Sequence, residues 1–155
     1  FVTKKIVRGL CEIKYNKRKI LFLGNLNAKR DWGYAKEYCE ILWKILQLKK
    51  PNDFVIATGK NYSVRDFVET TGKELNMNII WRGKGLKEVG YDTRSKKIII
   101  KVDPYFFRPN DVQSLLGDST KLLKAMKQKP KTSFNQLIKI MVKNEIKLIK
   151  SNRLY

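Results

Sequence analysis

Apolar residues recur at intervals of three and four positions along several stretches of the chain, a spacing that is typical of amphipathic helices. The first such stretch covers residues 1–14. Two later helices should begin at Ser63 and Ser133, because each serine stands three residues before an acid or a glutamine, as in a capping box. The expected helices are residues 1–14, a helix after Trp32-Gly33 that ends near Pro51, a helix from Ser63, shorter segments over 112–116 and 119–127, and a last helix from Ser133.

Short β-branched or apolar runs between these helices predict buried strands. The run Lys97–Val102 is the clearest of them, because it is continuous and rich in isoleucine. Strands that alternate with helices indicate an α/β fold, but the runs are too few and too short for a complete doubly wound sheet. The expected strands are Ile20–Leu23, Asp53–Ala57, Asn78–Trp81 and Lys97–Val102.

The composition fits one globular domain without a membrane span. The chain has 155 residues, of which 43% are hydrophobic and 11% aromatic, and this is enough for a core of its own. No apolar run approaches the length of a transmembrane helix, and the first residues do not resemble a signal peptide. The chain begins with Phe1 rather than methionine, so we expect it to be a piece of a longer polypeptide.

Histidine is absent and the two cysteines are isolated, which removes several kinds of site. We therefore expect no zinc site of the common kind, and acid–base catalysis by histidine and a Ser-His-Asp triad are excluded within this chain. Cys11 and Cys39 occupy helical, mostly apolar positions, and we expect both to be reduced core thiols of a cytoplasmic protein.

The formal net charge of +20 leaves two explanations open. Taken alone, it suggests a nucleic acid or an anionic membrane as the partner. The lysines are spread along the whole chain, however, together with abundant isoleucine and asparagine, and compositional drift produces this combination at exposed positions. We favour drift and keep a basic nucleic-acid-binding module as the alternative.

Two short motifs resemble functional sites, but their context favours another interpretation. Gly83-Lys84-Gly85 is an isolated Gly-x-Gly that does not open a helix, so it indicates a loop rather than a dinucleotide fingerprint. Tyr15 and Lys19 match a Tyr-x-x-x-Lys pair, but about one such match is expected by chance in so lysine-rich a chain. Tyr15 would also lack an enclosing pocket, because it falls at a helix end in a charged break.

Two arginines are candidates for binding an anion. Arg30 follows a predicted strand and precedes a predicted helix, next to Asp31 and Trp32. Its planar guanidinium suits phosphate oxygens, while Asp31 could orient the fork or pair elsewhere and Trp32 could form a wall of the site or part of the core. Arg108 follows three aromatic residues and stands three positions before Asp111, so this pair could hold a phosphate and a ribose hydroxyl together. A surface ion pair is the alternative for both arginines.

Several blocks of the sequence, taken together, resemble one enzyme family. They are Phe1–Ile6, Leu23–Gly33, Phe54–Gly59, Ser63–Arg65, Glu88–Gly90, Val102–Asp103 and Tyr105–Pro109, followed by Leu115–Asp118 and Lys129–Phe134. In this order and spacing they resemble the GDP-mannose 4,6-dehydratases, which belong to the extended short-chain dehydrogenase/reductases. The block Gly-Asn-Leu-x-Ala-Lys-Arg-Asp-Trp-Gly is highly specific to this family, whereas its Arg-Asp-Trp core is shared with related nucleotide-sugar epimerases and dehydratases.

The resemblance is to the C-terminal half of these enzymes. It implies an α/β fold made of the last elements of a Rossmann-like domain and a small α/β substrate-binding domain, with residues 1–155 as one nucleotide-sugar-binding portion. The glycine-rich NADP loop and the catalytic threonine, glutamate, tyrosine and lysine of the family would all lie upstream of Phe1. The chain would therefore hold no catalytic or cofactor-binding residue and would be inactive alone.

By the same resemblance, Arg30 and Arg108 would grip the pyrophosphate of GDP, and Asp111 would bond the ribose hydroxyls. The other substrate-binding residues that it implies are Thr3 and Lys5 on the first helix, Gly24 and Asn25 in the turn after the first strand, and Lys29. The chain departs from the family pattern where Asn27 replaces an aspartate, Tyr34 and Tyr62 replace histidines, and Asn110-Asp111 replaces Thr-Glu. Asp111 keeps the acceptor but is one methylene shorter than the usual glutamate.

The expected function is therefore the substrate-binding part of an NADP-dependent hydro-lyase. By resemblance, that enzyme converts GDP-mannose to GDP-4-keto-6-deoxymannose and water, on the way to GDP-fucose or GDP-rhamnose. At full length it would be a homo-oligomer with neither membrane nor nucleic-acid partners. A related nucleotide-sugar epimerase or reductase is the alternative within the same superfamily, and the basic nucleic-acid-binding module is the alternative of another class.

Overall fold

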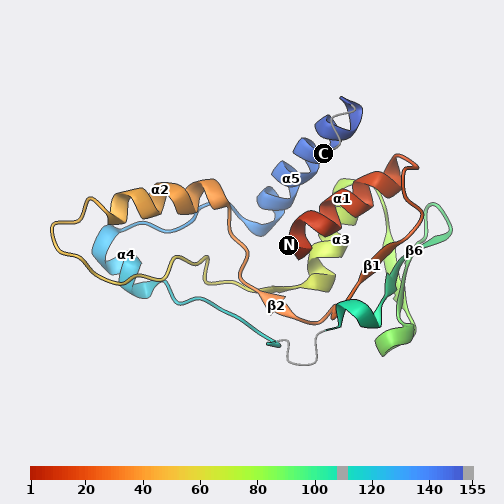
Figure 1. Ribbon diagram of the computed structural model, residues 1–155, viewed down its shortest axis with the longest axis horizontal. Coiled ribbons are helices and arrows are strands. Elements are labelled where there is room, and N and C mark those ends of the chain that lie inside the picture. Colours follow the sequence, from red (N-terminus) through yellow and green to blue (C-terminus); the bar gives the residue numbers. More distant parts are fainter. Residues whose placement is uncertain (108–111, 152–155) are drawn as a thin grey trace.

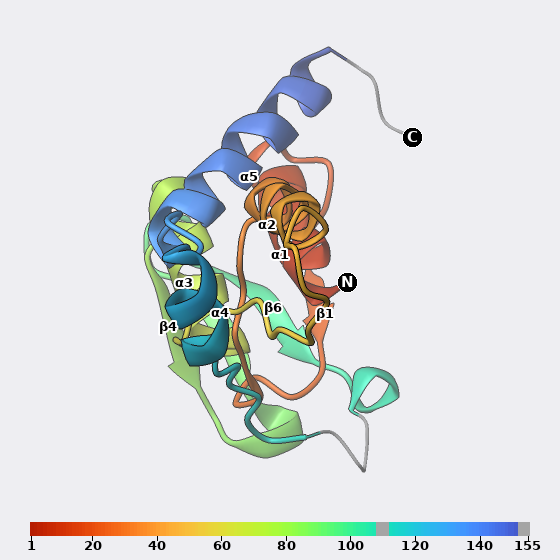
Figure 2. The same ribbon diagram turned by 90° about the vertical axis from the view of Figure 1, so that its left-hand side faces the viewer.

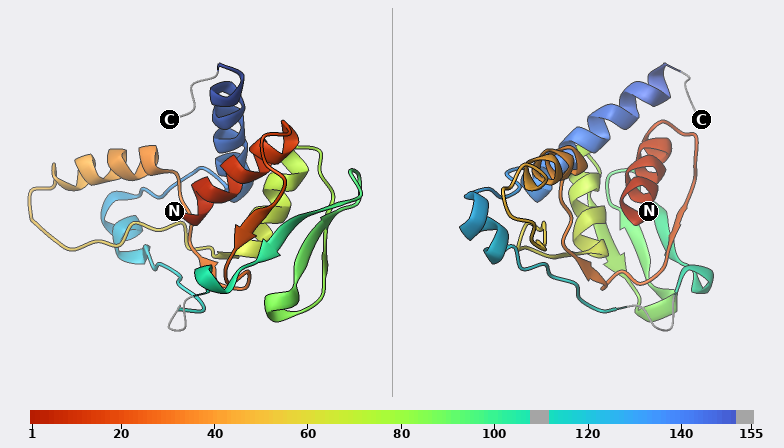
Figure 3. Two further views of the ribbon diagram at one scale, coloured as in Figure 1. Left: turned by 45° about the vertical axis from the view of Figure 1, so that its right-hand side comes forward. Right: turned by 60° about the vertical axis from the view of Figure 1, so that its left-hand side comes forward.

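The computed structural model describes residues 1–107 and 112–151, and within them three helices lie on one side of a four-stranded sheet. Helices α1, α3 and α5 pack against one another in this body, and Figures 1 and 3 show them beside the strands. The bounds are α1 Val2–Lys14, β1 Leu21–Leu23, β2 Lys29–Arg30, α2 Ala35–Ile45, β3 Tyr62–Ser63, α3 Val64–Glu74, β4 Ile79–Arg82, η1 Gly85–Lys87, β5 Val89–Asp92, β6 Lys97–Val102, η2 Pro104–Phe106, α4 Thr120–Met126 and α5 Phe134–Lys150. The α/β class predicted from the sequence is confirmed.

The larger sheet is mixed and has the strand order β1-β6-β5-β4. β1 runs parallel to β6, with Leu21 opposite Ile100, whereas β5 pairs antiparallel with both β6 and β4. The sequence pattern does not predict β5, because its residues Val-Gly-Tyr-Asp include glycine and aspartate, which are depleted in strands. Gly90 is nevertheless needed there, since a Cβ atom on it would lie 2.9 Å from the Cβ atom of Ile100.

Two helices begin at the capping boxes that the sequence predicts. At the start of α3, Ser63 Oγ accepts a hydrogen bond from the backbone N–H of Asp66, whose carboxylate accepts one in return from the N–H of Ser63. Ser133 and Gln136 make the same reciprocal pair at the start of α5. Each box gives a hydrogen-bond partner to two backbone N–H groups. One of them lies in the first turn of the helix, where N–H groups have no partner within the helix.

The core of the body lies between the sheet and its three helices. Its fully buried apolar side chains include Ile6 and Leu10 of α1, Phe67 and Val68 of α3, Ile138 of α5, and Leu21 and Ile100 of the sheet. Cys11 is buried among them, and burial, followed by the charge of Glu145, raises the pKa of its thiol to about 12. The prediction that Cys11 lies in the core is therefore confirmed.

An aromatic cluster joins the small β2–β3 ribbon to the body. Phe134, the first residue of α5, stacks on Tyr62 of β3 with ring centroids 3.9 Å apart and on Trp32 at 6.1 Å. Phe67 of α3 meets the ring of Phe134 edge-on at 5.6 Å. Of the two roles considered for Trp32, the structure therefore supports packing against the core.

Helices α2 and α4 stand away from the body at one end of the molecule in Figure 1, and Figure 2 looks onto that end. We call residues 34–57 and 116–131, which contain these two helices, the arm. On α2, Ile41 is buried, but Leu42, Trp43 and Leu46 expose 53%, 62% and 80% of their surface. The predicted helix therefore exists, but most of its apolar stripe does not join the core of the body.

Three sequence predictions in and beside the arm are wrong. Residues 53–57, although described throughout, form no strand, because no neighbouring segment pairs with their backbone N–H and C=O groups. Residues 112–116 form no helix, and Ser114 instead makes an isolated parallel bridge with Lys29. Cys39 is exposed rather than buried, on a helix whose buried residue is Ile41.

Two further features are missing from the described residues 1–107 and 112–151. No helix there is sufficiently long and apolar to cross a lipid bilayer. Nor do these residues contain a group of three or more histidine, cysteine, aspartate or glutamate side chains that could hold a metal ion.

Candidate functional site

The residues implied by the resemblance come from three neighbouring elements. Thr3 and Lys5 lie in the first turns of α1, and both are partly buried. Gly24 and Asn25 follow the end of β1, while Lys29 and Arg30 form β2. Arg108 and Asp111 lie outside the described residues, so their predicted contacts with a nucleotide stay predictions.

Lys5 and Gly24 meet at the turn η2. The N–H of Asp103 donates to the carbonyl of Leu23 at 2.8 Å, and this bond brings η2 against the end of β1. A Cβ atom on Gly24 would overlap the carbonyl oxygen of Phe106 and lie 2.6 Å from its carbonyl carbon, so the approach requires glycine. Lys5 Nζ lies 3.1 Å from the centroid of the Phe106 ring, in a cation–π contact.

The ammonium group of Lys5 is partly withdrawn from water at this place. Burial lowers its pKa, the nearby Arg18 lowers it further, and the carboxylate of Asp103 opposes both effects. A partly desolvated cation interacts more strongly with an anion than a fully hydrated one does. Lys5 is therefore suited to bind a charged group.

Lys29 and Arg30 are fixed against the chain that follows residue 111. The N–H of Lys29 donates to the carbonyl of Gln113 at 2.8 Å, and its own carbonyl accepts from the N–H of Leu115 at 3.0 Å. Arg30 Nη1 donates to the carbonyl of Val112 at 2.6 Å and to that of Lys29 at 2.8 Å. The structure thus brings these two cations to a segment that lies some eighty positions further along the chain.

Asp31, next to Arg30, ties β2 to the turn at residues 58–59. Its carboxylate accepts hydrogen bonds from the N–H of Thr58 at 3.1 Å, from the hydroxyl of Thr58 at 2.5 Å and from the N–H of Gly59 at 2.9 Å. Of the two roles considered for Asp31, these bonds support pairing elsewhere. Gly59 has φ of +74°, a conformation that L-residues with side chains rarely adopt.

The turn between Gly24 and Arg30 is held by the start of α3. The N–H of Val64 donates to the carbonyl of Ala28 at 3.1 Å, and the N–H of Arg65 donates to that of Leu26 at 2.9 Å. Arg65 Nη2 also reaches the side-chain oxygen of Asn27 at 3.1 Å. Arg65 is absent from the predicted site residues, and its place in the block Ser63–Arg65 is the one sequence signal that points to it.

Of the remaining departures from the family pattern, one has a clear packing role. Tyr62 lies in the aromatic cluster on Phe134, and Tyr34 occupies the N-cap position of α2 without a side-chain capping bond. Tyr15, half of the apparent Tyr-x-x-x-Lys pair, stands at the C-terminal end of α1 and exposes 36% of its surface. This position is open to solvent, as expected for a chance match.

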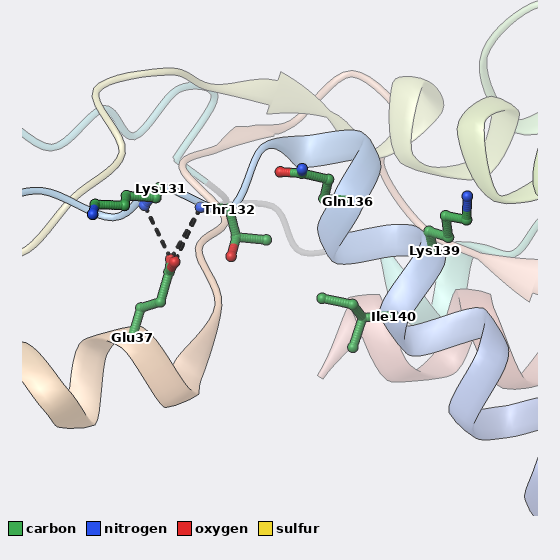
Figure 4. Close-up of a pocket in the computed structure, with 6 residues that line it drawn as sticks. All are labelled: Glu37, Lys131, Thr132, Gln136, Lys139 and Ile140. Carbon is green, nitrogen blue, oxygen red and sulfur yellow. Dashed lines mark hydrogen bonds between the residues drawn. The ribbon is translucent and has the colours of Figure 1, made fainter.

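A separate hollow of about 360 Å³ lies between α2 and the start of α5. Figure 4 shows its lining residues, Glu37, Lys131, Thr132, Gln136, Lys139 and Ile140. The carboxylate of Glu37 accepts hydrogen bonds at 3.2 Å from the backbone N–H groups of Lys131 and Thr132. The contact ties the arm to the body, and none of the predicted site residues lines the hollow.

Comparison with known proteins gives one consistent family. The model of the GDP-mannose 4,6-dehydratase family matches residues 1–141. A GDP-mannose 4,6-dehydratase from Dictyostelium discoideum is 47% identical over 155 residues, which is the whole of this chain and 44% of the relative. The human GDP-mannose 4,6-dehydratase is 42% identical over 152 residues, or 98% of this chain and 41% of the relative.

Solved structures resemble the fold at much lower sequence identity. RMD from Pseudomonas aeruginosa, complexed with NADPH, matches 95% of this chain with a TM-score of 0.74 at 14% identity, over 43% of its own length. UDP-glucose 4-epimerase from Bifidobacterium longum, in complex with NAD⁺ and UDP, matches 99% of this chain with a TM-score of 0.68 at 12% identity, over 41% of its own length. The chain thus spans less than half of the length of these relatives and structures.

Proposed function

Because this chain belongs to the GDP-mannose 4,6-dehydratase family, we propose that residues 1–155 form the nucleotide-sugar-binding portion of such an enzyme. The whole enzyme would convert GDP-mannose to GDP-4-keto-6-deoxymannose and water. A nucleotide-sugar epimerase or reductase would have a similar fold, but the family model and the high identities favour the dehydratase.

The observation that carries the proposal is the approach of two chain segments to the predicted site residues. The described chain before residue 108 packs against Lys5 and Gly24, and the chain after residue 111 is bonded to Lys29 and Arg30. Lys5 and Gly24 therefore lie beside the chain just before residue 108, and Lys29 and Arg30 lie beside the chain just after residue 111. A diphosphate suits such a place, since arginine offers planar, charge-assisted hydrogen bonds to its oxygens.

In this proposal the chain contributes binding energy and position rather than the chemical step. A firm grip on the GDP group would hold the sugar at a fixed place, and binding energy from such a remote group can assist the reaction at the sugar. Lys5, Lys29 and Arg30 would hold the phosphates, while Thr3 and Asn25 would contact the rest of the nucleotide.

The described residues do not fit the NADP that the family uses. The Gly-x-Gly of this chain, Gly83–Gly85, lies between β4 and β5 and leads into a three-residue 3₁₀ turn, not into an α-helix whose N-terminus could hold a pyrophosphate. The cofactor and the catalytic groups belong, in this proposal, to a part of the enzyme outside residues 1–155.

The arm would be the contribution of this chain to the Rossmann-like domain. Its strand-like residues 53–57 are extended without a neighbouring strand, and Leu42, Trp43 and Leu46 of α2 are exposed. When an α/β sheet is divided, a helix on one part keeps an apolar face without its cover. A strand segment on that part likewise lacks its neighbouring strand. The rest of the sheet would cover both.

Titration of GDP into the purified chain tests the proposal. We expect saturable binding, and we expect Arg30→Ala to weaken it by about 1.5–3 kcal/mol, because a charge-assisted contact to phosphate is lost. The matched control is Arg94→Ala, since Arg94 Nη1 also donates to a backbone carbonyl, that of Asn76, but lies at the β5–β6 turn. Equal GDP affinity of Arg30→Ala and the wild-type chain in isothermal calorimetry would refute the assignment.

The same preparation distinguishes the alternative of a nucleic-acid-binding module. Such a module would bind heparin tightly, would lose this binding steeply with salt, and would not respond to GDP. We expect instead that GDP binding survives moderate salt and that heparin competes weakly.

A further inference from the structure

Arg65 connects the turn that carries four of the predicted site residues to a rigid support on the sheet. Its side chain lies in the first turn of α3, is 24% exposed and reaches Asn27 in the middle of the turn between Gly24 and Arg30. We propose that Arg65 is a positioning residue, which sets the geometry of this turn for nucleotide-sugar binding through its bond to Asn27. The proposal rests on the proposed function only for the identity of the ligand.

Two neighbouring side chains, Glu88 and Trp81, hold the guanidinium of Arg65 in place. Glu88 accepts two hydrogen bonds from this guanidinium, from Nη1 at 2.7 Å and from Nη2 at 3.1 Å. The guanidinium carbon lies 4.7 Å from the Trp81 ring centroid, and the indole N–H of Trp81 donates to Glu69 at 2.8 Å. A guanidinium that makes two hydrogen bonds to Glu88 and lies on the ring of Trp81 has little conformational freedom. It can therefore fix the position of Asn27, which it contacts.

Hydrogen bonds within the turn connect Arg65 to the predicted site residues. Asn27 Oδ1 accepts from Arg65, and the N–H of Asn27 donates to the side-chain oxygen of Asn25 at 2.9 Å. On either side of Asn27, Leu26 and Ala28 are buried and their carbonyls accept from the backbone at the start of α3. Residues 26–28 are thus joined to the start of α3 by two backbone hydrogen bonds and by the side-chain bond from Arg65. These bonds lie between the site residues Gly24-Asn25 and Lys29-Arg30.

Asn27 also gives this chain a feature that can be tested directly. It stands where the family pattern has an aspartate, so the bond to Arg65 has a charged donor and a neutral acceptor. An aspartate there would make both groups charged and would add the attraction of an ion pair to the hydrogen bond. If Arg65 acts through position 27, a carboxylate at this position should tighten the turn only when Arg65 is present.

The experiment is a double-mutant cycle in the 155-residue chain. Asn27→Asp and Arg65→Met are made singly and together, because methionine keeps an apolar stem over Trp81 while it removes the fork. Amide hydrogen exchange of residues 24–30 and GDP affinity are measured for each variant. Asn27→Ala removes the acceptor without touching α3 and serves if Arg65→Met does not fold. Arg82→Met is the control, since the guanidinium of Arg82 lies 3.9 Å from the Tyr91 ring centroid and, in the described part of the chain, makes no hydrogen bond to residues 24–30.

We expect Arg65→Met and Asn27→Ala to speed exchange in residues 24–30 and to weaken GDP binding by about tenfold, as the loss of one charge-assisted bond predicts. Asn27→Asp should slow exchange in the wild-type background. In the Arg65→Met background, the effect of Asn27→Asp on exchange should be at least about threefold smaller. Unchanged exchange in Asn27→Ala, or an equal effect of Asn27→Asp in both backgrounds, would overturn the proposal. Coupled exchange without GDP binding would instead support the positioning role and reject GDP as the ligand.

Discussion

Replacement of Phe134 by alanine is expected to lower the free energy of unfolding by about 3–5 kcal/mol, the range for loss of a buried phenylalanine. Phe134 is 7% exposed and contacts Tyr62, Trp32 and Phe67. Its ring joins the beginning of α5 to α3 and to the β2–β3 ribbon, so an empty space there would loosen three elements at once. Urea denaturation followed by far-UV circular dichroism measures the change.

The matched control for this prediction is Ile140→Ala on the same helix. Ile140 exposes 41% of its surface, so its loss should cost less than about 1 kcal/mol. If the two variants were equally stable, the aromatic cluster would not be part of the core. The Phe134 variant should also bind GDP less well, because Trp32 stands two residues after Arg30.

Gly24→Ala is expected to cost about 3 kcal/mol of stability and to remove most GDP affinity, because it forces a methyl group into a closely packed contact. The added Cβ atom would overlap the carbonyl oxygen of Phe106, and backbone cannot swing aside as the end of a flexible side chain can. The chain must then either unfold in part or move η2 away from the end of β1. Thermal denaturation and GDP titration of the same variant distinguish these two outcomes.

Gly85→Asn controls for glycine replacement as such. Gly85 has no atom within 4 Å of its ideal Cβ position, and asparagine tolerates its φ of +58° better than other residues do. We expect this variant to keep both stability and GDP affinity. A wild-type affinity in Gly24→Ala would show that the close approach of η2 has no part in binding.

Local signals predict the body of the fold well. The apolar faces of α1, α3 and α5, together with the serine capping boxes of α3 and α5, place these helices correctly because every determinant lies within a few residues. Residues 53–57 show the limit of this reasoning, since a strand depends on a partner that the pattern of one segment cannot supply. The exposed face of α2 has the same origin: the pattern predicts an apolar stripe, but not what the stripe packs against.

The candidate site divides in a similar way. The resemblance of the motifs predicts Lys5, Gly24, Lys29 and Arg30 as site residues, and the structure places them on α1, after β1 and on β2. Arg65 escaped sequence reasoning because its partners Glu88 and Asn27 lie 23 and 38 positions away, and no periodicity connects them. Arg108 and Asp111 were predicted from resemblance and lie outside the described residues, so GDP binding is the direct way to test them.

The central claim is that a diphosphate binds beside Lys5, Gly24, Lys29 and Arg30. Titration of GDP into the ¹⁵N-labelled chain, followed by NMR, tests it most directly. The backbone amides of these residues should shift together and saturate with one dissociation constant, while those of Lys143 and Lys147 on α5 should not move. Shifts that spread over the α5 lysines without saturation, or that leave the Gly24–Arg30 turn unchanged, would contradict the account.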